Sequence, residues 1–345
     1  MGNNDSCLRE AILKEETEEG KIRCLTCMRR CIIPESRLGF CKTRKNIEGK
    51  LFTLTYGDIS SISANPIEKK PFFHFYVGSK ALTVGSFSCN YKCSWCQNWE
   101  ISKHPPDEFK NYVSPEQFMR LVKAYKCQGT SISFNEPTLM LEYSLDVFRL
   151  AKDRGYYNTY VTNGYMTPEA LNLLIENGLD AMNVDVKGCK ETVKKYCGAD
   201  VDYVWDNIHE AKRRRIHIEI TTLVIPRVND NADCLRSIAQ RIKDEDDSIP
   251  WHVTRFHPDY KMRDRESTPT KTLEQARQIG LDKGLKYVYL GNVPGHSGEN
   301  TWCPDCGELI IERYIFGIIK YRLTTDKKCP NCGTEIPVIG EPNLR

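Results

Sequence analysis

Three closely spaced cysteines constrain this chain more than any other feature of its sequence. Cys89, Cys93 and Cys96 have C-x3-C-x2-C spacing and follow the β-branched run 82–85. A cubane iron–sulfur cluster normally takes four thiolates, but the next cysteine, Cys127, comes only after a predicted helix. Three ligands leave one iron with an open position, which is what distinguishes a reactive metal site from a structural one. The alternative is a closed zinc knuckle that borrows a remote fourth ligand.

Trp95 gives the loop the pattern C-x3-C-x-aromatic-C, which resembles the signature of the radical S-adenosylmethionine (radical SAM) superfamily. The resemblance implies a [4Fe-4S] cluster on the three cysteines, with SAM chelating the fourth iron and Trp95 beside it. It also implies reductive cleavage of SAM to methionine and a 5′-deoxyadenosyl radical that abstracts hydrogen. In such a site the cofactor supplies the chemistry, and the protein orients it and excludes water.

Length and charge narrow the remaining choices. A chain of 345 residues can form one large α/β domain with small appendages. Its net charge of +3, with 28% charged residues, is close to balance and gives no reason to expect a nucleic-acid partner. No apolar run approaches the roughly 20 residues that a membrane-spanning helix needs, so we expect no membrane partner.

The 16 cysteines gather at metal-ligand spacings and do not suggest a disulfide framework. Residues 1–20 are polar and rich in acidic side chains, the reverse of an apolar targeting segment. We expect this segment to be a solvated leader, helical if it is ordered. Together these features favour a reducing, cytoplasmic and oxygen-poor setting.

A second group of four cysteines defines a predicted N-terminal module, residues 21–65. Its spacing is C-x2-C-x3-C-x9-C, formed by Cys24, Cys27, Cys31 and Cys41. Four soft ligands so close together can close a tetrahedral site, and a short segment with few apolar residues needs such a link to fold. Zinc and a second iron–sulfur cluster both suit four thiolates. Buried thiols without a metal are the third option.

The predicted C-terminal module, residues 298–345, contains two C-P-x-C-G knuckles. They supply four thiolates, from Cys303, Cys306, Cys329 and Cys332. Paired knuckles of this kind, with a β hairpin predicted over 309–323 between them, are typical of a zinc ribbon. A rubredoxin-like mononuclear iron uses the same ligands, so we expect zinc or iron here.

Residues 66–297 alternate between strand and helix patterns. Strands are predicted at 131–134, 157–162, 181–186, 217–223, 251–256 and 287–290, and helices at 114–128, 139–154, 167–178, 201–214, 232–243 and 272–283. Such alternation predicts a parallel sheet covered by helices, either a barrel or a doubly wound layer. The radical SAM resemblance favours a partial (β/α)6 barrel whose cluster loop follows the first strand.

Polar motifs follow several of these strands, and ligands bind at the carboxyl ends of parallel strands. One strand ends in Asn-Glu-Pro, which resembles the superfamily's Gly-Gly-Glu-Pro motif that receives the SAM amino group. Two other strands end in Thr-Asn-Gly and Asp-x-Lys, which resemble the strand ends of enzymes that activate glycyl-radical proteins. From the residues alone, the glutamate could be a routine turn residue and the Asp–Lys pair a weak surface ion pair. The resemblance implies cofactor-binding roles for Asn135, Glu136, Thr162, Asn163, Asp185 and Lys187.

From residue 21 onward, the chain is similar to the AmmeMemoRadiSam-system group in the activase-like branch of the superfamily. Besides the cysteines, the similarity rests on Pro66-Ile-Glu-Lys-Lys-Pro71 and Arg255-Phe256-His257-Pro258. It implies an enzyme with oxidoreductase or lyase chemistry, acting on a protein, such as at a glycyl residue, or on a small molecule. An electron donor such as ferredoxin or flavodoxin is implied as a partner.

Two other functions stay open at this point. One is an RNA-modifying radical SAM enzyme that grips nucleic acid with its zinc ribbon, for which the basic run 212–215 gives slight support. The other is a non-catalytic multi-metal scaffold or electron-transfer protein.

Overall fold

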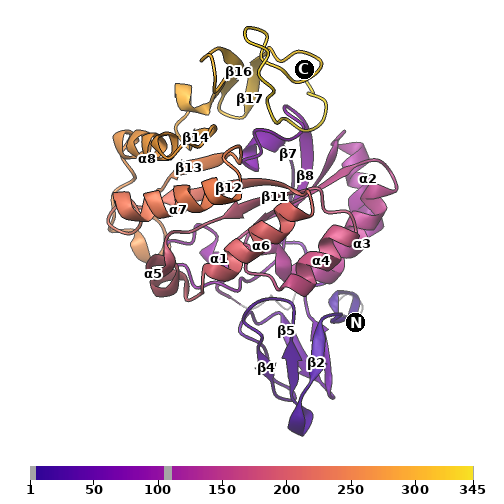
Figure 1. Ribbon diagram of the computed structural model, residues 1–345. Helices are drawn as coiled ribbons and strands as arrows, with labels where there is room; N and C mark the ends of the chain where they lie inside the picture. Colours follow the sequence, from indigo (N-terminus) through magenta and orange to yellow (C-terminus); the bar gives the residue numbers. More distant parts are fainter. Residues whose placement is uncertain (1–4, 105–110, 345) are drawn as a thin grey trace.

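An eight-stranded sheet forms the centre of the computed structural model, which describes residues 5–104 and 111–344 (Figure 1). The strand order is β14-β13-β12-β11-β10-β9-β8-β7; β7 is antiparallel to β8, and all other neighbours are parallel. The strands are β7 (Ser61–Pro66), β8 (Lys80–Gly85), β9 (Gly129–Ile132), β10 (Tyr157–Thr162), β11 (Ala181–Asp185), β12 (His217–Val224), β13 (Trp251–Arg255) and β14 (Val288–Gly291). Because β14 and β7 are free edges, the barrel is partial and open.

Helices connect the parallel strands in sequence order. They are α2 (Pro115–Ala124), α3 (Leu141–Lys152), α4 (Pro168–Glu176), α6 (Asp202–Arg213), α7 (Ala232–Glu245) and α8 (Thr270–Asp282), with short turns α1 (Trp99–Ser102) and α5 (Lys190–Thr192). Their starts follow from local sequence: Ser114 and Gln117 form a reciprocal capping box, and the Thr167 hydroxyl accepts from the backbone N–H of Ala170. The predicted α/β architecture is confirmed.

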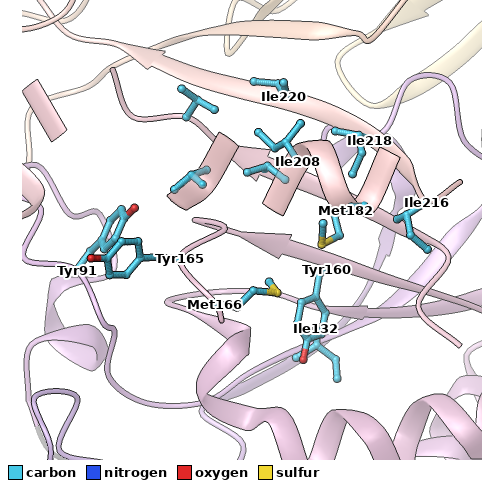
Figure 2. Packing of buried hydrophobic residues seen from close by; sticks show 14 of the residues in the cluster. Tyr91, Ile132, Tyr160, Tyr165, Met166, Met182, Ile208, Ile216, Ile218 and Ile220 are labelled. Atoms are coloured by element: carbon cyan, nitrogen blue, oxygen red, sulfur yellow. The ribbon is translucent and has the colours of Figure 1, made fainter. Parts of the chain in front are cut away.

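The main core lies between the sheet and its helices. Figure 2 shows Ile208 of α6 facing Met182 of β11 and Ile218 and Ile220 of β12. All four side chains are almost completely buried. Burial of such side chains stabilises the fold by about 1.5–3 kcal/mol each. Within the described ranges, no helix is long and apolar enough to cross a membrane.

The inner face of the sheet is closed at the N-terminal ends of its strands by the segment that joins β7 to β8. The backbone N–H groups of Phe73 and His74 each donate to the Glu219 carboxylate at 2.8 Å. His217 and His252 approach the same carboxylate at 3.0 and 2.6 Å. Burial opposes ionisation, but the hydrogen bonds from the two histidines outweigh it and lower the pKa of Glu219.

Residues 5–53 form two small antiparallel sheets, ordered β1-β6-β5 and β2-β3-β4. Their strands are β1 (Arg9–Glu10), β2 (Lys14–Glu16), β3 (Ile22–Cys24), β4 (Ile32–Ile33), β5 (Arg44–Ile47) and β6 (Lys50–Thr53). The first part of the chain therefore differs from the expected helical leader: β1 pairs with β6 and β2 with β3, and Ala11 is buried. Its polar residues face solvent from strands of two and three residues, which are too short to show a strand pattern in the sequence.

The C-terminal region is a three-stranded antiparallel sheet of β15 (Thr301–Trp302), β16 (Leu309–Tyr314) and β17 (Gly317–Tyr321). The hairpin predicted over 309–323 is thus confirmed. Its Ile310 and Ile311 pack in one apolar cluster with Phe73, Tyr287 and Tyr289. Figure 1 shows this sheet and the N-terminal sheets at opposite ends of the molecule.

Short turns complete the described chain. A π-helical turn, η5 (Val193–Cys197), precedes α6, and the 3-10 turns are η1 (Asp5–Cys7), η2 (Glu18–Gly20), η3 (Ile67–Lys69), η4 (Pro137–Met140), η6 (Tyr260–Met262) and η7 (Ser297–Glu299).

Candidate active site

A cavity of about 320 Å³ opens at the carboxyl ends of the parallel strands, the edge at which the polar motifs were expected to meet. This volume lies at the lower end of the range for small-molecule sites. Its lining includes most of the residues singled out from the sequence: Cys89, Cys93, Trp95, Cys96, Asn135, Asn163, Asp185 and Lys187.

The three cysteines lie on the loop that follows β8. The backbone N–H of Tyr91 donates to Cys89 Sγ at 3.3 Å, and Cys96 Sγ lies 3.0 Å from the Ser102 hydroxyl. Lys103 Nζ donates to the carbonyl oxygen of Tyr91 at 3.0 Å and fixes the loop from the other side. Hydrogen bonds of this kind to ligand sulfurs help to set the potential of an iron–sulfur site.

A residue missed by sequence reasoning, Cys197, lies beside the second cysteine. Its Sγ is 3.4 Å from Cys93 Sγ, and this hydrogen bond lowers the pKa of Cys93 to about 7 although burial opposes the shift. Cys197 has no metal-ligand spacing in the sequence; it is buried, and it contacts a candidate ligand. No spacing in the sequence indicates this contact, since η5 supplies it from a distant part of the chain.

A single metal ion and a cubane cluster require different spacings of their ligand sulfurs. Among the described residues, only the four C-terminal cysteines bring at least three potential ligand atoms within 4.8 Å of one another. Four thiolates on one zinc ion lie about 3.8 Å apart, given Zn–S bonds of about 2.3 Å. Each thiolate of a cubane binds a different iron, so wider spacing is required there. Cys197 is too close to Cys93 to bind a separate iron.

Asp185 and Lys187 form an ion pair inside the cavity, with Lys187 Nζ 2.7 Å from Asp185 Oδ2. Burial alone would lower the pKa of Lys187, but Asp185 outweighs it and raises that pKa. Each side chain keeps some exposure, 28% for Asp185 and 18% for Lys187. The pair therefore offers a charged, hydrogen-bonding surface to a bound ligand.

Asn135 and Asn163 reach the cavity from neighbouring strand ends. Asn135 donates to the Ser86 carbonyl at 2.7 Å, and its buried Oδ1 has no hydrogen-bond partner in the described part of the chain. Asn163 donates to Asn90 Oδ1 at 2.8 Å and lies 3.8 Å from Cys89 Sγ. Asn135 offers a free acceptor, whereas Asn163 is engaged with the cysteine loop.

Glu136 and Thr162 lie behind the cavity wall and not on its surface. The Glu136 carboxylate accepts from Thr138 at 3.0 Å, from the Thr162 hydroxyl at 2.7 Å and from the Asn163 N–H at 2.9 Å. Burial raises the pKa of Glu136 while these bonds oppose the rise. The cofactor-binding role expected for Glu136 stays a prediction; in this structure its carboxylate holds two strand ends together.

The backbone of this strand end adopts conformations that glycine favours, although Phe134 and Asn135 stand there in place of a double glycine. Phe134 and Asn135 both have left-handed φ values, 54° and 56°, and asparagine adopts this region more readily than most residues. Gly85 makes room for the turn, because a Cβ there would lie 2.7 Å from Phe134 Cβ.

The four C-terminal cysteines form a compact site as predicted. Cys303 Sγ and Cys332 Sγ are 3.5 Å apart, and Cys306 Sγ and Cys329 Sγ are 3.7 Å apart. These separations approach the edge of a tetrahedron around one metal ion. A hydrogen bond with Thr334 lowers the pKa of Cys332 to about 6, which favours the thiolate form that binds metal.

An open α/β barrel with three thiolates and a charged cavity at its strand ends defines a class of metalloenzyme in which a cluster and a small cofactor share one pocket. Residues 84–238 match the family model described as Radical SAM superfamily. The chain belongs to this superfamily, in its activase-like branch. The family implies a [4Fe-4S] cluster and SAM, and radical chemistry that begins with SAM cleavage.

Two curated relatives, both from Methanocaldococcus jannaschii, support this assignment. The chain is 44% identical to an uncharacterized protein over 336 residues, which is 96% of this chain and 100% of the relative. It is 27% identical to a candidate glycyl-radical enzyme activating enzyme over 226 residues, 63% of this chain and 89% of the relative.

A solved structure supports the fold. Streptococcus suis SuiB bound to S-adenosylmethionine has a TM-score of 0.50 and 11% identity; the match covers 66% of this chain and 53% of SuiB.

Proposed function

We propose that this protein cleaves SAM reductively at a [4Fe-4S] cluster held by Cys89, Cys93 and Cys96, and that the resulting radical abstracts hydrogen from a protein substrate. The observation that supports this proposal best is that three thiol side chains and a charged pair, Asp185 and Lys187, line one cavity. When bound, the cluster would supply the electron that breaks the sulfonium bond of SAM.

The cavity's own residues would bind and orient the cofactor. Asn135 Oδ1, buried without a partner in the described residues, is an acceptor suited to an ammonium group. Asp185 would accept from ribose hydroxyls, and Lys187 would pair with a carboxylate by charge-assisted hydrogen bonds. Trp95, buried against Tyr196 at 5.8 Å between ring centroids, would exclude water beside the cluster.

A glycyl residue of a partner protein is the substrate that the comparisons favour, because one relative carries the name of a glycyl-radical enzyme activating enzyme. A small-molecule substrate is the alternative. The reductant would be a low-potential carrier such as ferredoxin or flavodoxin, and the setting cytoplasmic. We further propose zinc at the C-terminal four-cysteine site, and module boundaries at 21–65, 66–297 and 298–345.

An RNA substrate has less support from the structure. In the basic run 212–215, Lys212 Nζ lies 2.6 Å from an Asp246 carboxylate oxygen, and Arg213 Nη2 lies 2.7 Å from Glu210. Arg214 also lies 3.9 Å from Glu210, so three of the run's four charges have acidic neighbours, which weakens a patch for phosphates.

The test is SAM cleavage by anaerobically reconstituted protein with a strong reductant, followed as 5′-deoxyadenosine by chromatography and mass spectrometry. We expect product from the wild-type protein and none from Cys93→Ala. Cys127→Ala is the matched control, because Cys127 is also buried but lies outside all three cysteine groups. Undiminished product from Cys93→Ala would overturn the proposal.

A further inference from the structure

A lysine to which the proposed function gives no role lies inside the SAM cavity. Lys70 belongs to the sequence run Pro66-Ile-Glu-Lys-Lys-Pro71, lines the cavity, and is 4% exposed. Among the residues that the structure describes it has no carboxylate partner, and burial, followed by the charge of Lys69, lowers its pKa to about 8. Such a cation is costly to enclose unless a partner is bound to it.

The strands around it fix the position of the Lys70 backbone. The neighbouring Pro71 carbonyl accepts from Asn183 Nδ2 at 2.9 Å, and the Thr221 hydroxyl donates to Asn183 Oδ1 at 2.8 Å. Asn183 and Asp185 stand two residues apart on β11, so they face the same side of the sheet, roughly 6.6 Å apart along the strand. The backbone beside Lys70 thus lies one layer of side chains deeper in the barrel than Asp185.

Phe134 holds its ring beside Lys70 at a cost in backbone strain. Lys70 Nζ lies 4.6 Å from the centroid of this ring. The φ of Phe134, 54°, lies in the left-handed region, which a bulky side chain rarely adopts. Backbone strain of this kind gathers at functional sites. The ring attracts the ammonium group through its π electrons, but it carries no net charge and so leaves the charge of Lys70 without a counterion.

The other buried or half-buried lysines of this cavity have partners of their own. Lys187 pairs with Asp185 at 2.7 Å, and Lys103 Nζ donates to the Tyr91 carbonyl on the loop that carries the cysteines. Asp185 is the one carboxylate among the described residues that line the cavity, and it is already engaged. A carboxylate partner for Lys70 would therefore have to come from a bound molecule.

We propose that Lys70 binds a carboxylate of the substrate, and so selects substrates in which an acidic group lies near the carbon that loses hydrogen. Asn135, Asp185 and Lys187, which we assign to SAM, lie at the strand ends, whereas the backbone of Lys70 lies deeper beside the same cavity. An ammonium group with three N–H donors suits a carboxylate through charge-assisted hydrogen bonds. The carboxylate belongs either to an acidic residue of a protein or to a small organic acid. This selection of substrate rests on the proposed function, whereas carboxylate binding itself does not.

Calorimetric titration of the anaerobically reconstituted protein, with and without SAM, tests the carboxylate site. The probes are succinate and two end-blocked peptides, Ala-Gly-Asp-Gly-Ala and Ala-Gly-Asn-Gly-Ala. We expect the wild-type protein to bind succinate or the aspartyl peptide about tenfold or more tightly than the asparaginyl peptide, a comparison that needs no substitution. Binding of the aspartyl peptide alone would assign the carboxylate to a protein, and binding of succinate alone would assign it to a small acid. Binding of neither would overturn the proposal.

Substitutions locate the bound carboxylate. Lys70→Met should weaken binding of the carboxylate probe by about tenfold or more. Lys70→Arg keeps the positive charge and should weaken it less. Lys80→Met is the matched control and should leave the affinity unchanged, because Lys80 is exposed, begins β8 and is not among the residues that line the cavity. Equal affinities of the wild type and Lys70→Met for the probe would contradict the proposal.

The affinity for SAM separates a substrate role of Lys70 from a cofactor role. SAM binding, followed by its effect on the spectrum of the reduced cluster, should be the same in Lys70→Met as in the wild type. Equal losses of SAM affinity and probe affinity in this variant would show that Lys70 binds the cofactor, against the proposal. Absence of 5′-deoxyadenosine from the wild type with every reductant would instead count against the proposed function, and the titrations without SAM would still decide whether Lys70 binds a carboxylate.

Discussion

Lys70 is a charged side chain almost fully enclosed beside the SAM cavity. It is 4% exposed, lines the cavity, and places Nζ 4.6 Å from the ring centroid of Phe134. No ion-pair partner for it is found among the described residues. Burial, and then the neighbouring charge of Lys69, lower its pKa from 10.5 to about 8. The positive charge is therefore costly to keep in the folded protein.

This cost predicts a pH-dependent stability. Between pH 8 and 10.5 Lys70 is neutral in the folded protein but protonated in the unfolded chain, so its contribution to stability rises as the pH rises. Lys70→Met keeps the packing and removes the charge. The variant's stability advantage should be greatest near pH 7 and shrink by about 2–3 kcal/mol towards pH 10.5, measured as the free energy of unfolding in denaturant.

Lys69→Arg is the matched control, because Lys69 is adjacent but exposed and arginine keeps the charge that acts on Lys70. It should change the free energy of unfolding equally at all pH values in this range. If the free energy of unfolding of Lys70→Met followed that of the wild type in parallel across this pH range, the lowered pKa of Lys70 would be wrong.

At the level of single residues, sequence reasoning located the cavity but not every role. Spacing alone singled out Cys89, Cys93 and Cys96, all three of which line the cavity. Burial is decided in three dimensions, however. The sequence therefore could not show that the Glu136 carboxylate accepts hydrogen bonds from Thr162 and Asn163. Contacts between distant segments were invisible for the same reason, as with Cys197.

Among the elements, the segment between β7 and β8 depends on one buried carboxylate. Glu219 receives two backbone N–H groups and two histidine side chains, and it is fully buried. Charge-assisted bonds of this kind are stronger than neutral ones.

Glu219→Gln should therefore lower the free energy of unfolding by about 2–3 kcal/mol, measured by denaturant titration at pH 7. Because the pKa of Glu219 is lowered from 4.5 on folding, its stabilisation is present above that value and is lost as the pH falls below it. The variant should lack this acid-dependent loss.

Glu274→Gln serves as the comparison, since Glu274 is 53% exposed and, among the residues that the structure describes, forms an ion pair with His296 alone. It should change stability by less than about 0.5 kcal/mol. Equal effects of the two substitutions would show that the Glu219 network does not hold the segment.

The order of elements was predictable because strand and helix periods alternate clearly. The predicted strand at 157–162 has the bounds of β10. The preceding strand was placed two residues late, because Gly129 resembled a helix stop. It begins β9 instead, since the Tyr157 ring covers it and a Cβ there would lie 2.1 Å from that ring.

Across the whole molecule, the two four-cysteine groups lie at opposite ends of the strands of the central sheet: one at their carboxyl ends, the other at their amino ends. Cys41 of the N-terminal group accepts from Ser88, and the neighbouring Arg29 donates to Asn90, beyond the carboxyl end of β8. The C-terminal sheet packs on Tyr287 and Tyr289, at the start of β14. Only the N-terminal group is therefore near the SAM cavity, and loss of metal at the two ends should have separable effects.

Cys306→Ser tests this separation. It removes one of four ligands of the C-terminal site, so we expect the loss of one metal ion per chain and a lower melting temperature, because metal binding and folding of a small module are coupled. Below that temperature, SAM should still change the spectrum of the reduced cluster. The SAM cavity lies at the carboxyl ends of the strands, away from the C-terminal site. Metal analysis, thermal melting and spectroscopy on one preparation, with Cys127→Ala alongside, measure all three. A variant that keeps its full metal content, or that loses the response to SAM while folded, would contradict this division of the molecule.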